Sequence, residues 1–408
     1  MPALVLDSVI YMTLFLVQQA LRDAGAGPVE LSTTIATYSA VYAVACPVSG
    51  ALVGARRRPM LLVGLLLVLG DIALLSRAED LAAFQKLIGA LAIGTSLVWP
   101  SFQALIAEES PGALRPVRMA IFNLGWTAGK AGGLFCAGWV LTLAGGAGPA
   151  FRLVIAPAAL LPLLFLARFL TEPAVAKDSA KDSAKAPAGS RPDSEAGRVP
   201  EASAAREARA EGETAPATTP FALALGSNFL VWGVQAAVLA QIPLIGEAAG
   251  LGPGGSGMLL GGLVLAQAVT FLALRSRAER LDRPGIAAAA PGLAAVVLAL
   301  IGLDPPAAVL ALLFLALGMA IGLSYALSLH RAMEARGVGL RTAWHEANLG
   351  LAGLSVSALA GGLVEALGLT MTWRVMAVAL AVASLGIFAA ARFLQTLHSR
   401  SCPASSRA

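Results

Sequence analysis

The stretch TEPAVAKDSAKDSAKAPAGSRPDSEAGRVPEASAAREARAEGETAPATT, residues 171–219, divides this 408-residue chain into two parts. It consists mainly of Ala, Ser, Pro, Glu, Lys and Arg, contains no aromatic residue, and carries the near-repeat AKDSAKDSAK. A segment of this composition cannot bury enough apolar surface to offset the entropy that it would lose on ordering. We therefore predict a disordered linker that tethers the two parts.

Six apolar stretches lie on each side of the linker. They span 4–21, 31–55, 60–76, 82–107, 118–143 and 149–169, then 221–246, 256–274, 286–303, 306–329, 342–366 and 371–394. Most of them match the ~20 residues with which a helix crosses a bilayer. Only 13% of the chain is charged, where a soluble protein has about 25%. Because the runs are continuous and do not alternate, they favour helices over a barrel. We predict an all-α integral membrane protein with twelve transmembrane helices.

Basic residues gather in the loops on one side of the predicted membrane. That side holds Arg56, Arg57, Arg58, Arg115, Arg118, Arg275, Arg277, Arg280, Arg283, Arg331, Arg336, Arg341, Arg392, Arg400 and Arg407. The other side holds Arg22, Arg77, Lys86, Arg152 and Arg374. The positive-inside rule places the first side, both termini and the linker in the cytoplasm, which fits the cell (inner) membrane. The basic residues form no single patch with interleaved aromatics, so we expect no nucleic-acid partner.

The two parts of the chain repeat each other. Asn123-Leu124-Gly125 recurs as Asn348-Leu349-Gly350, and Phe151-Arg152 corresponds to Trp373-Arg374. A Gly-x-Ser at 94–96 returns at 322–324, so all the offsets fall between 222 and 228. A duplicated six-helix unit with parallel halves is a transporter arrangement. We assign 1–170 and 220–396 to two pseudo-symmetric six-helix bundles and 397–408 to a cytoplasmic tail.

Two motifs carry a family resemblance. Gly50-Ala-Leu-Val-Gly54-Ala-Arg56-Arg57-Arg58 resembles the cytoplasmic signature between helices two and three of the major facilitator superfamily, with Gly54 where the family usually has an acid. Residues 125–133, GWTAGKAGG, look like the glycine-rich helix-five motif of its exporters, with Lys130 where these carry proline. The resemblance implies the major facilitator fold. It also implies a gating role for the first motif and, without fixing the direction, a link to efflux.

Polar side chains recur along single faces of four predicted helices. These stripes are Asp7, Tyr11 and Gln18; Thr95, Trp99 and Gln103; Asn228, Trp232 and Gln235; and Ser324, Tyr325 and Ser328. Polar groups are costly in lipid and normally face a bundle interior or a water-filled cavity. The resemblance places these four helices, the first, fourth, seventh and tenth, around a central cavity. We predict that the stripes line the substrate pathway, while hydrogen bonding between helices is the alternative for any single residue.

Lys130 is the sharpest single candidate. It lies twelve residues after Arg118, about 18 Å along a helix and so near the bilayer midplane. Asn123, Trp126 and Lys130 share one face. A lysine at this depth costs about 2.5–3.5 kcal/mol to insert. We hypothesise that Lys130 binds an anionic substrate group or titrates during coupling. A structural ion pair with Asp7 or Asp71 is the alternative.

Two further charged or titratable residues lie near the predicted cytoplasmic surface. His345 and Glu346 follow Arg341 by four and five residues. This spacing predicts that both are solvated, and Glu346 is a candidate for gating.

The chain lacks the signatures of ATP-driven pumps and of common membrane enzymes. It contains no G-x-x-x-x-G-K-[ST] loop, no H-E-x-x-H and no G-x-S-x-G, and these motifs carry ATP, zinc and serine chemistry. We predict a monomeric, non-enzymatic secondary transporter without cofactor or metal, which works by alternating access. Its partners would be an unidentified small molecule, amphipathic or anionic, and the lipid bilayer, with an ion or proton for coupling. A receptor or scaffold that has lost transport is the alternative.

Overall fold

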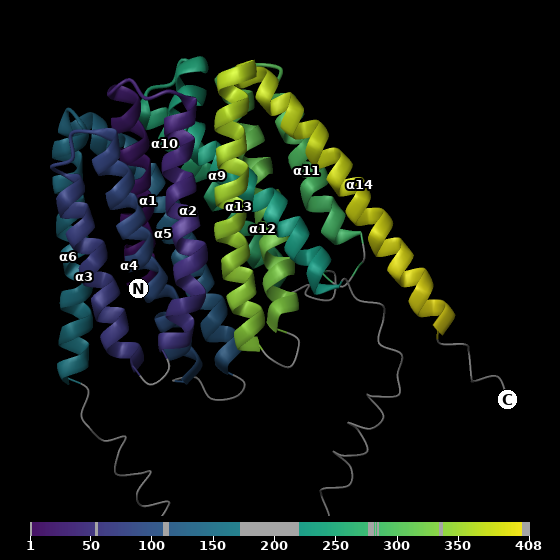
Figure 1. Cartoon of the computed structure of the whole chain (residues 1–408), viewed down its shortest axis with the longest axis horizontal. Helices are drawn as coiled ribbons and strands as arrows, with labels where there is room; N and C mark the ends of the chain where they lie inside the picture. Colours follow the sequence, from purple (N-terminus) through teal and green to yellow (C-terminus); the bar gives the residue numbers. More distant parts are fainter. Residues whose placement is uncertain are drawn as a thin grey trace, which may run out of the picture.

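The computed structural model describes residues 2–53, 56–108, 114–171, 220–275, 281, 283, 285–333 and 338–401. These residues form twelve helices (Figure 1). Their bounds are α1 Pro2–Asp23, α2 Pro28–Val53, α3 Arg57–Leu75, α4 Leu81–Glu108, α5 Leu114–Ala144, α6 Ala147–Thr171, α9 Phe221–Ala248, α10 Pro253–Arg275, α11 Ile286–Ile301, α12 Ala307–Met333, α13 Val338–Leu367 and α14 Leu369–Ser401. Except for Thr171, the predicted linker lies outside the described residues, as do Gly54 and residues 402–408.

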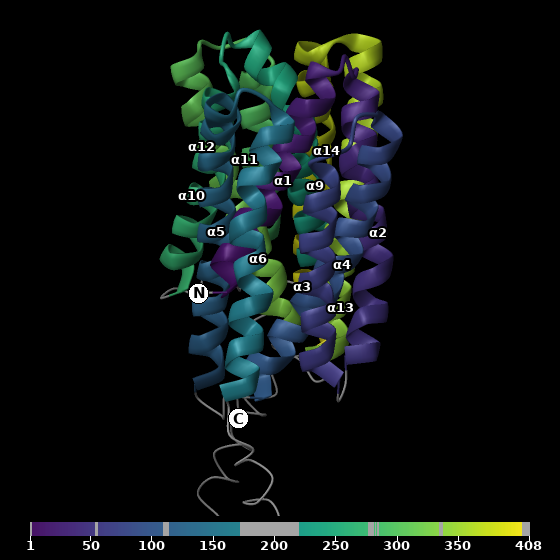
Figure 2. The ribbon, with the colours of Figure 1, turned by 90° about the vertical axis from the view of Figure 1, so that its left-hand side faces the viewer.

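The helices form one tall bundle with two groups side by side. Helices α1–α6 make up the N-terminal half and α9–α14 the C-terminal half (Figures 1 and 2). Ten of the twelve are long and apolar enough to cross a membrane by length and composition. Helix α11 is shorter, with 16 residues, and α5, which carries Lys130, is not among the ten. The predicted all-α membrane fold of two six-helix bundles is thus confirmed.

The first helix of each half ends in the same way. At the end of α1, Gly25 has φ +87 and the amides of Gly25 and Ala26 donate to the carbonyls of Arg22 and Leu21. At the end of α9, Gly250 has φ +67, and the amides of Gly250 and Leu251 donate to the carbonyls of Glu247 and Gly246. This is the Schellman cap, in which glycine takes the left-handed position without a Cβ penalty. The repeated sequence thus gives repeated local structure.

The two halves pack against each other along two glycine-rich seams. Where α5 meets α10, an added methyl at Gly138 would overlap the Pro253 carbonyl, and one at Gly261 would overlap the Phe135 ring. Where α2 meets α13, a methyl at Gly353 would overlap the Ser39 side chain. Small residues let helix backbones approach closely in a membrane. These seams hold the halves together while leaving space between them for a cavity.

Candidate functional site

A cavity lies between the two halves. The space between its lining residues amounts to about 1070 Å³, part of it open to solvent. The N-terminal half contributes residues of α1, α2, α4 and α5, and the C-terminal half residues of α9, α10, α12 and α13. A ligand in this cavity would therefore contact both halves at once.

The cavity wall is rich in aromatic side chains. Eight of its 24 residues are aromatic, against 6% of the whole chain. They are Tyr11, Tyr38, Tyr42, Trp99, Phe122, Trp126, Trp232 and Tyr325. All four tyrosines of the chain are among them. The wall thus offers flat ring faces together with phenol and indole donors.

Lys130 is the one basic residue of the cavity wall among the described residues. Its side chain is only 2% exposed, and Nζ lies 4.2 Å from the ring centroid of Tyr11 and 4.7 Å from that of Trp232. Asp7, 3% exposed, interacts with it electrostatically. Across the described residues, no ion pair within 4 Å joins Lys130 to Asp7 or Asp71. Lys130 is therefore held by ring faces drawn from both halves.

Glu346 also lines the cavity and bridges the halves. Its carboxylate accepts hydrogen bonds from the Tyr42 hydroxyl at 3.0 Å and from Gln103 Nε2 at 3.3 Å. Glu346 lies about 12 Å along α13, which begins at Val338, and its side chain is partly exposed in the cavity wall. The spacing from Arg341 also predicts a solvated His345, but His345 is fully buried.

Nine of the fifteen predicted pathway residues line the cavity. They are Asp7, Tyr11, Trp99, Gln103, Trp126, Lys130, Trp232, Gln235 and Tyr325. The other six are not part of its wall: Gln18, Thr95, Asn123, Asn228, Ser324 and Ser328.

Three of the residues outside the wall support its rings. Thr95 shares a hydrogen bond of 3.1 Å with Tyr38, and Asn123 accepts one of 3.1 Å from Trp126 Nε1. Ser328 bonds His345, whose ring lies 4.9 Å from that of Tyr325, between centroids.

Sequence reasoning missed the contribution of α2. Tyr38, Ser39 and Tyr42 all line the cavity, and the two tyrosine rings stack at 6.2 Å. The available signal was two tyrosines four residues apart within an apolar stretch, which places them on one helix face. They fall outside the predicted pathway because it comprises only the stripes of four other helices and the face of Lys130.

The predicted gating motif lies away from the cavity. Gly50 and Arg56 are exposed, Arg57 and Arg58 are partly buried, and a methyl at Gly50 would meet no atom within 4 Å. None of these residues belongs to the cavity wall.

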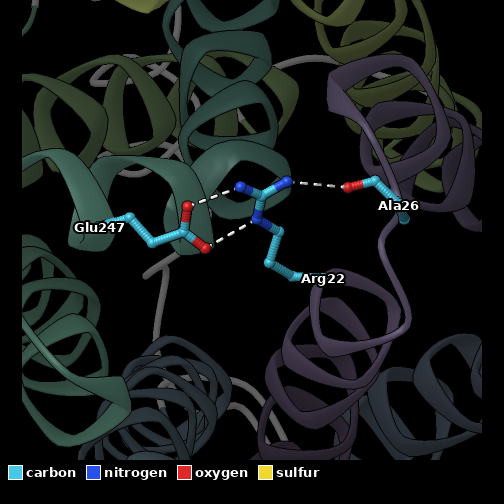
Figure 3. Close-up of polar contacts among 3 residues, drawn as sticks. All are labelled: Arg22, Ala26 and Glu247. Carbon is cyan, nitrogen blue, oxygen red and sulfur yellow. Dashed lines mark hydrogen bonds and ion pairs between the residues drawn. The ribbon is translucent and has the colours of Figure 1, made fainter.

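An ion pair joins the two halves at the end of the bundle opposite the predicted gating motif. Arg22 at the end of α1 forms a two-point ion pair with Glu247 at the end of α9, with both N···O distances at 2.7 Å (Figure 3). The Arg22 guanidinium also donates to the Ala26 carbonyl at 3.3 Å. Nearby, Gln241 Nε2 donates to Ser32 Oγ at 2.7 Å. We call this group of contacts the Arg22–Glu247 closure.

Comparisons with known proteins agree with this architecture. The family model described as Major Facilitator Superfamily matches residues 3–337. A crystal structure of a peptide transporter POT, in the form of a mutant, has a TM-score of 0.69 and 15% identity, covering 97% of this chain and 94% of that one. A POT family transporter in complex with 5-aminolevulinic acid has a TM-score of 0.70 and 12% identity, covering 96% of each chain.

At these identities the two solved structures show the fold alone. Among curated proteins, no sequence matches. The family match covers most of the chain, and the cavity between duplicated halves is the arrangement expected of a transporter. The chain belongs to the Major Facilitator Superfamily and is a multi-pass membrane protein of the secondary-transporter class.

Proposed function

We propose that this protein moves a small organic molecule across the cell (inner) membrane by exposing the cavity alternately to its two sides, with a proton as the coupling ion. The observation that carries this proposal is the cavity lined by both halves. Lys130 of α5 lies against Trp232 of α9, and Glu346 of α13 is bonded to α2 and α4. A ligand that touches both halves shifts the equilibrium between their arrangements when it binds one arrangement more tightly than the other.

The proposed orientation follows from the basic loops. Arg56, Arg57 and Arg58 lie at the start of α3, at the end of the bundle opposite the Arg22–Glu247 closure (Figure 1), so this closure would face the exterior. Both termini and the linker would then be cytoplasmic, with the two halves at 1–170 and 220–396 moving as rigid units of a monomer. The pathway would comprise the nine predicted residues that line the cavity together with Tyr38, Tyr42 and Glu346.

Asp7 is the proposed site of the coupling proton. It is buried in the cavity wall. It interacts electrostatically with Lys130 of α5, which attracts it, with Glu346 of α13, which repels it, and with Tyr11, Tyr38 and Tyr325 of α1, α2 and α12. A buried charge is stable only when it is paired. A proton on Asp7 removes the negative charge that interacts with Lys130, so protonation would change what the cavity can bind.

Transport is tested with purified protein in two steps. A thermal-shift screen against metabolites and drugs identifies ligands, because binding raises the apparent stability. Flux of each hit into proteoliposomes is then measured with and without an imposed pH gradient. We expect saturable flux that the pH gradient accelerates. Binding without flux would support a receptor or scaffold instead.

The proton site has a matched control on the same helix. Asp7→Asn should remove the acceleration by the pH gradient, because the amide cannot take up the proton. Asp23→Asn changes an exposed acid of α1 and should leave the acceleration intact. Acceleration that survives in Asp7→Asn would contradict the assignment of Asp7.

A further inference from the structure

The ammonium group of Lys130 has unused hydrogen-bonding capacity. A lysine has three N–H donors, yet no described residue forms a hydrogen bond or close ion pair with this one. The faces of Tyr11 and Trp232 attract its charge but provide no oxygen acceptor. Lys130 is nine-tenths buried and belongs to the cavity wall. Its donors are thus available to a ligand in the cavity.

The position beside the Lys130 ammonium favours an anion over a cation. The carboxylate of Glu346 already accepts hydrogen bonds from Tyr42 and Gln103. Asp7 interacts electrostatically with Lys130 and becomes neutral when it carries the coupling proton, so this step rests on the proposed function. The buried ammonium then needs an anion from elsewhere. An organic cation would find the faces of Tyr11 and Trp232 already occupied by a positive charge and would be repelled.

The rest of the wall suits a flat apolar body. Trp99 and Phe122 meet edge to face with 5.8 Å between ring centroids. Tyr325 lies 5.5 Å from Trp126 and 5.6 Å from Trp232. Ring faces and edges of this kind pack best against another planar π-system. The aromatic wall thus begins directly beside the ammonium of Lys130.

We propose that the substrate is an organic anion in which an acid group is attached to a planar, mainly apolar body. Its acid group binds Lys130 Nζ, and its body packs among the cavity rings contributed by both halves. The coupling proton and the anion then enter together, because the proton frees Lys130 from Asp7.

Three naphthalene probes of nearly equal size separate charge from shape. Naphthalene-2-carboxylate is the anion, naphthalene-2-carboxamide the neutral isostere and 2-naphthylmethylammonium the cation. Binding to the purified full chain in detergent is measured by titration calorimetry at pH 6. We expect the carboxylate to bind at least tenfold more tightly than the amide and the ammonium not to bind measurably. Cyclohexanecarboxylate, which lacks a planar ring, should bind more weakly than naphthalene-2-carboxylate.

Substitution of Lys130 assigns the preference to one group. Lys130→Gln should bring the carboxylate and amide affinities to within twofold of each other, whereas Lys130→Arg should keep the preference for the carboxylate. Lys86→Gln makes the same change at an exposed lysine of α4 outside the cavity wall and should leave all affinities unchanged. If Lys130→Gln does not fold, the relative affinities of the parent protein for the three probes still decide the substrate class.

Four results would overturn the proposed substrate class. They are equal binding of carboxylate and amide, tighter binding of the ammonium probe, no binding of any probe, and an unchanged preference in Lys130→Gln. Each of them is compatible with flux of another compound in the proteoliposome assay, so transport itself would stand. Conversely, binding of the carboxylate without flux of any ligand would contradict transport and leave the anion site established.

Discussion

The two halves of the protein share their frame and differ in their chemistry. Arg22 and Glu247 are 225 residues apart, the same offset as Gly25 from Gly250 and Asn123 from Asn348. They occupy the same position in the two Schellman caps, because the carbonyl of each accepts the amide of the capping glycine. Equivalent positions thus carry opposite charges, and the pseudo-symmetry that makes them equivalent also brings them together.

The cavity does not follow this symmetry. The position equivalent to buried Lys130 is Ser355, which is exposed, and the position equivalent to Asp7 is Trp232. The N-terminal half provides both Asp7 and Lys130, while the C-terminal half provides Glu346. The comparison teaches that duplication built the frame and the closure, whereas divergence built the binding site. An asymmetric organic molecule requires such an asymmetric site.

The largest effect is expected from locking the symmetric pair. Arg22→Cys and Glu247→Cys, introduced together after replacement of Cys46, Cys136 and Cys402, can be joined by a short bismaleimide. Because this link holds α1 against α9, proteoliposome flux should fall to background after cross-linking. Each single cysteine variant, treated in the same way, should retain its flux. Full flux in the cross-linked protein would show that the halves do not separate at this end.

A large effect is also expected at the seam between α5 and α10. Gly138→Ala places a methyl against the Pro253 carbonyl, and such overpacking costs about 1–3 kcal/mol. The thermal unfolding midpoint and the flux should both fall. Gly125→Ala on the same helix meets no atom within 4 Å and should be neutral or stabilising by up to about 1 kcal/mol. Equal behaviour of the two variants would argue against a close seam.

A smaller effect distinguishes two equivalent polar residues. Gln103 and Ser328 are 225 residues apart, yet Gln103 donates to Glu346 inside the cavity and Ser328 bonds His345 outside its wall. Gln103→Leu frees the Glu346 carboxylate to repel an organic anion, so the KM for flux should rise by about tenfold, the size of one hydrogen bond of about 1.5 kcal/mol. Ser328→Ala should change the KM by less than about twofold. Ser328 bonds His345, which is not part of the cavity wall and lies against the Tyr325 ring, so the loss of this hydrogen bond has a small effect on substrate binding. The reverse order would mean that the cavity follows the pseudo-symmetry after all.

The smallest effect concerns the net strength of the closure. The side chains of Arg22 and Glu247 are 32% and 51% exposed, and an exposed ion pair contributes about 0–1 kcal/mol. Arg22→Glu or Glu247→Arg alone should lower the unfolding midpoint slightly. The double exchange should restore it, since the two positions are equivalent. If the double exchange lowers the unfolding midpoint more than either single change, the two positions are not interchangeable between the halves.

The sequence predicted the frame better than the site. Apolar runs reflect the hydrocarbon thickness, so eleven of the twelve described helices begin and end within four residues of their predicted bounds, whereas α14 continues to Ser401, into the segment predicted as a tail. Which face of a helix turns inward depends on packing against other helices, and Tyr38 and Tyr42 face the cavity because Ser39 and Ala43 of α2 pack on Gly353 and Gly350 of α13. Such contacts between distant segments leave no periodic signal in a single sequence.

The burial of His345 also cannot be predicted from the charged residues beside it in the sequence. Glu346 and His345 follow an arginine closely, which suggested the surface, but their partners come from other segments, namely α2, α4 and α12. A buried polar residue is stabilised by those partners, and no rule of spacing identifies them. The polar stripes do include side chains that line the cavity directly, such as Asp7 and Trp232.

The lysine in α5 has a consequence for the synthesis of the protein. Helix α5 is not among the ten that are apolar enough to cross a membrane by composition, and a central lysine opposes insertion by about 2.5–3.5 kcal/mol. Its glycines Gly129 and Gly133 pack directly on the backbone of α1 at Leu4 and Ser8, and Asp7 of α1 supplies a counter-charge. We therefore expect α5 to insert stably only together with α1, which precedes it in the chain. Lys130, which we propose binds the substrate, would thereby also favour the insertion of α1 before α5.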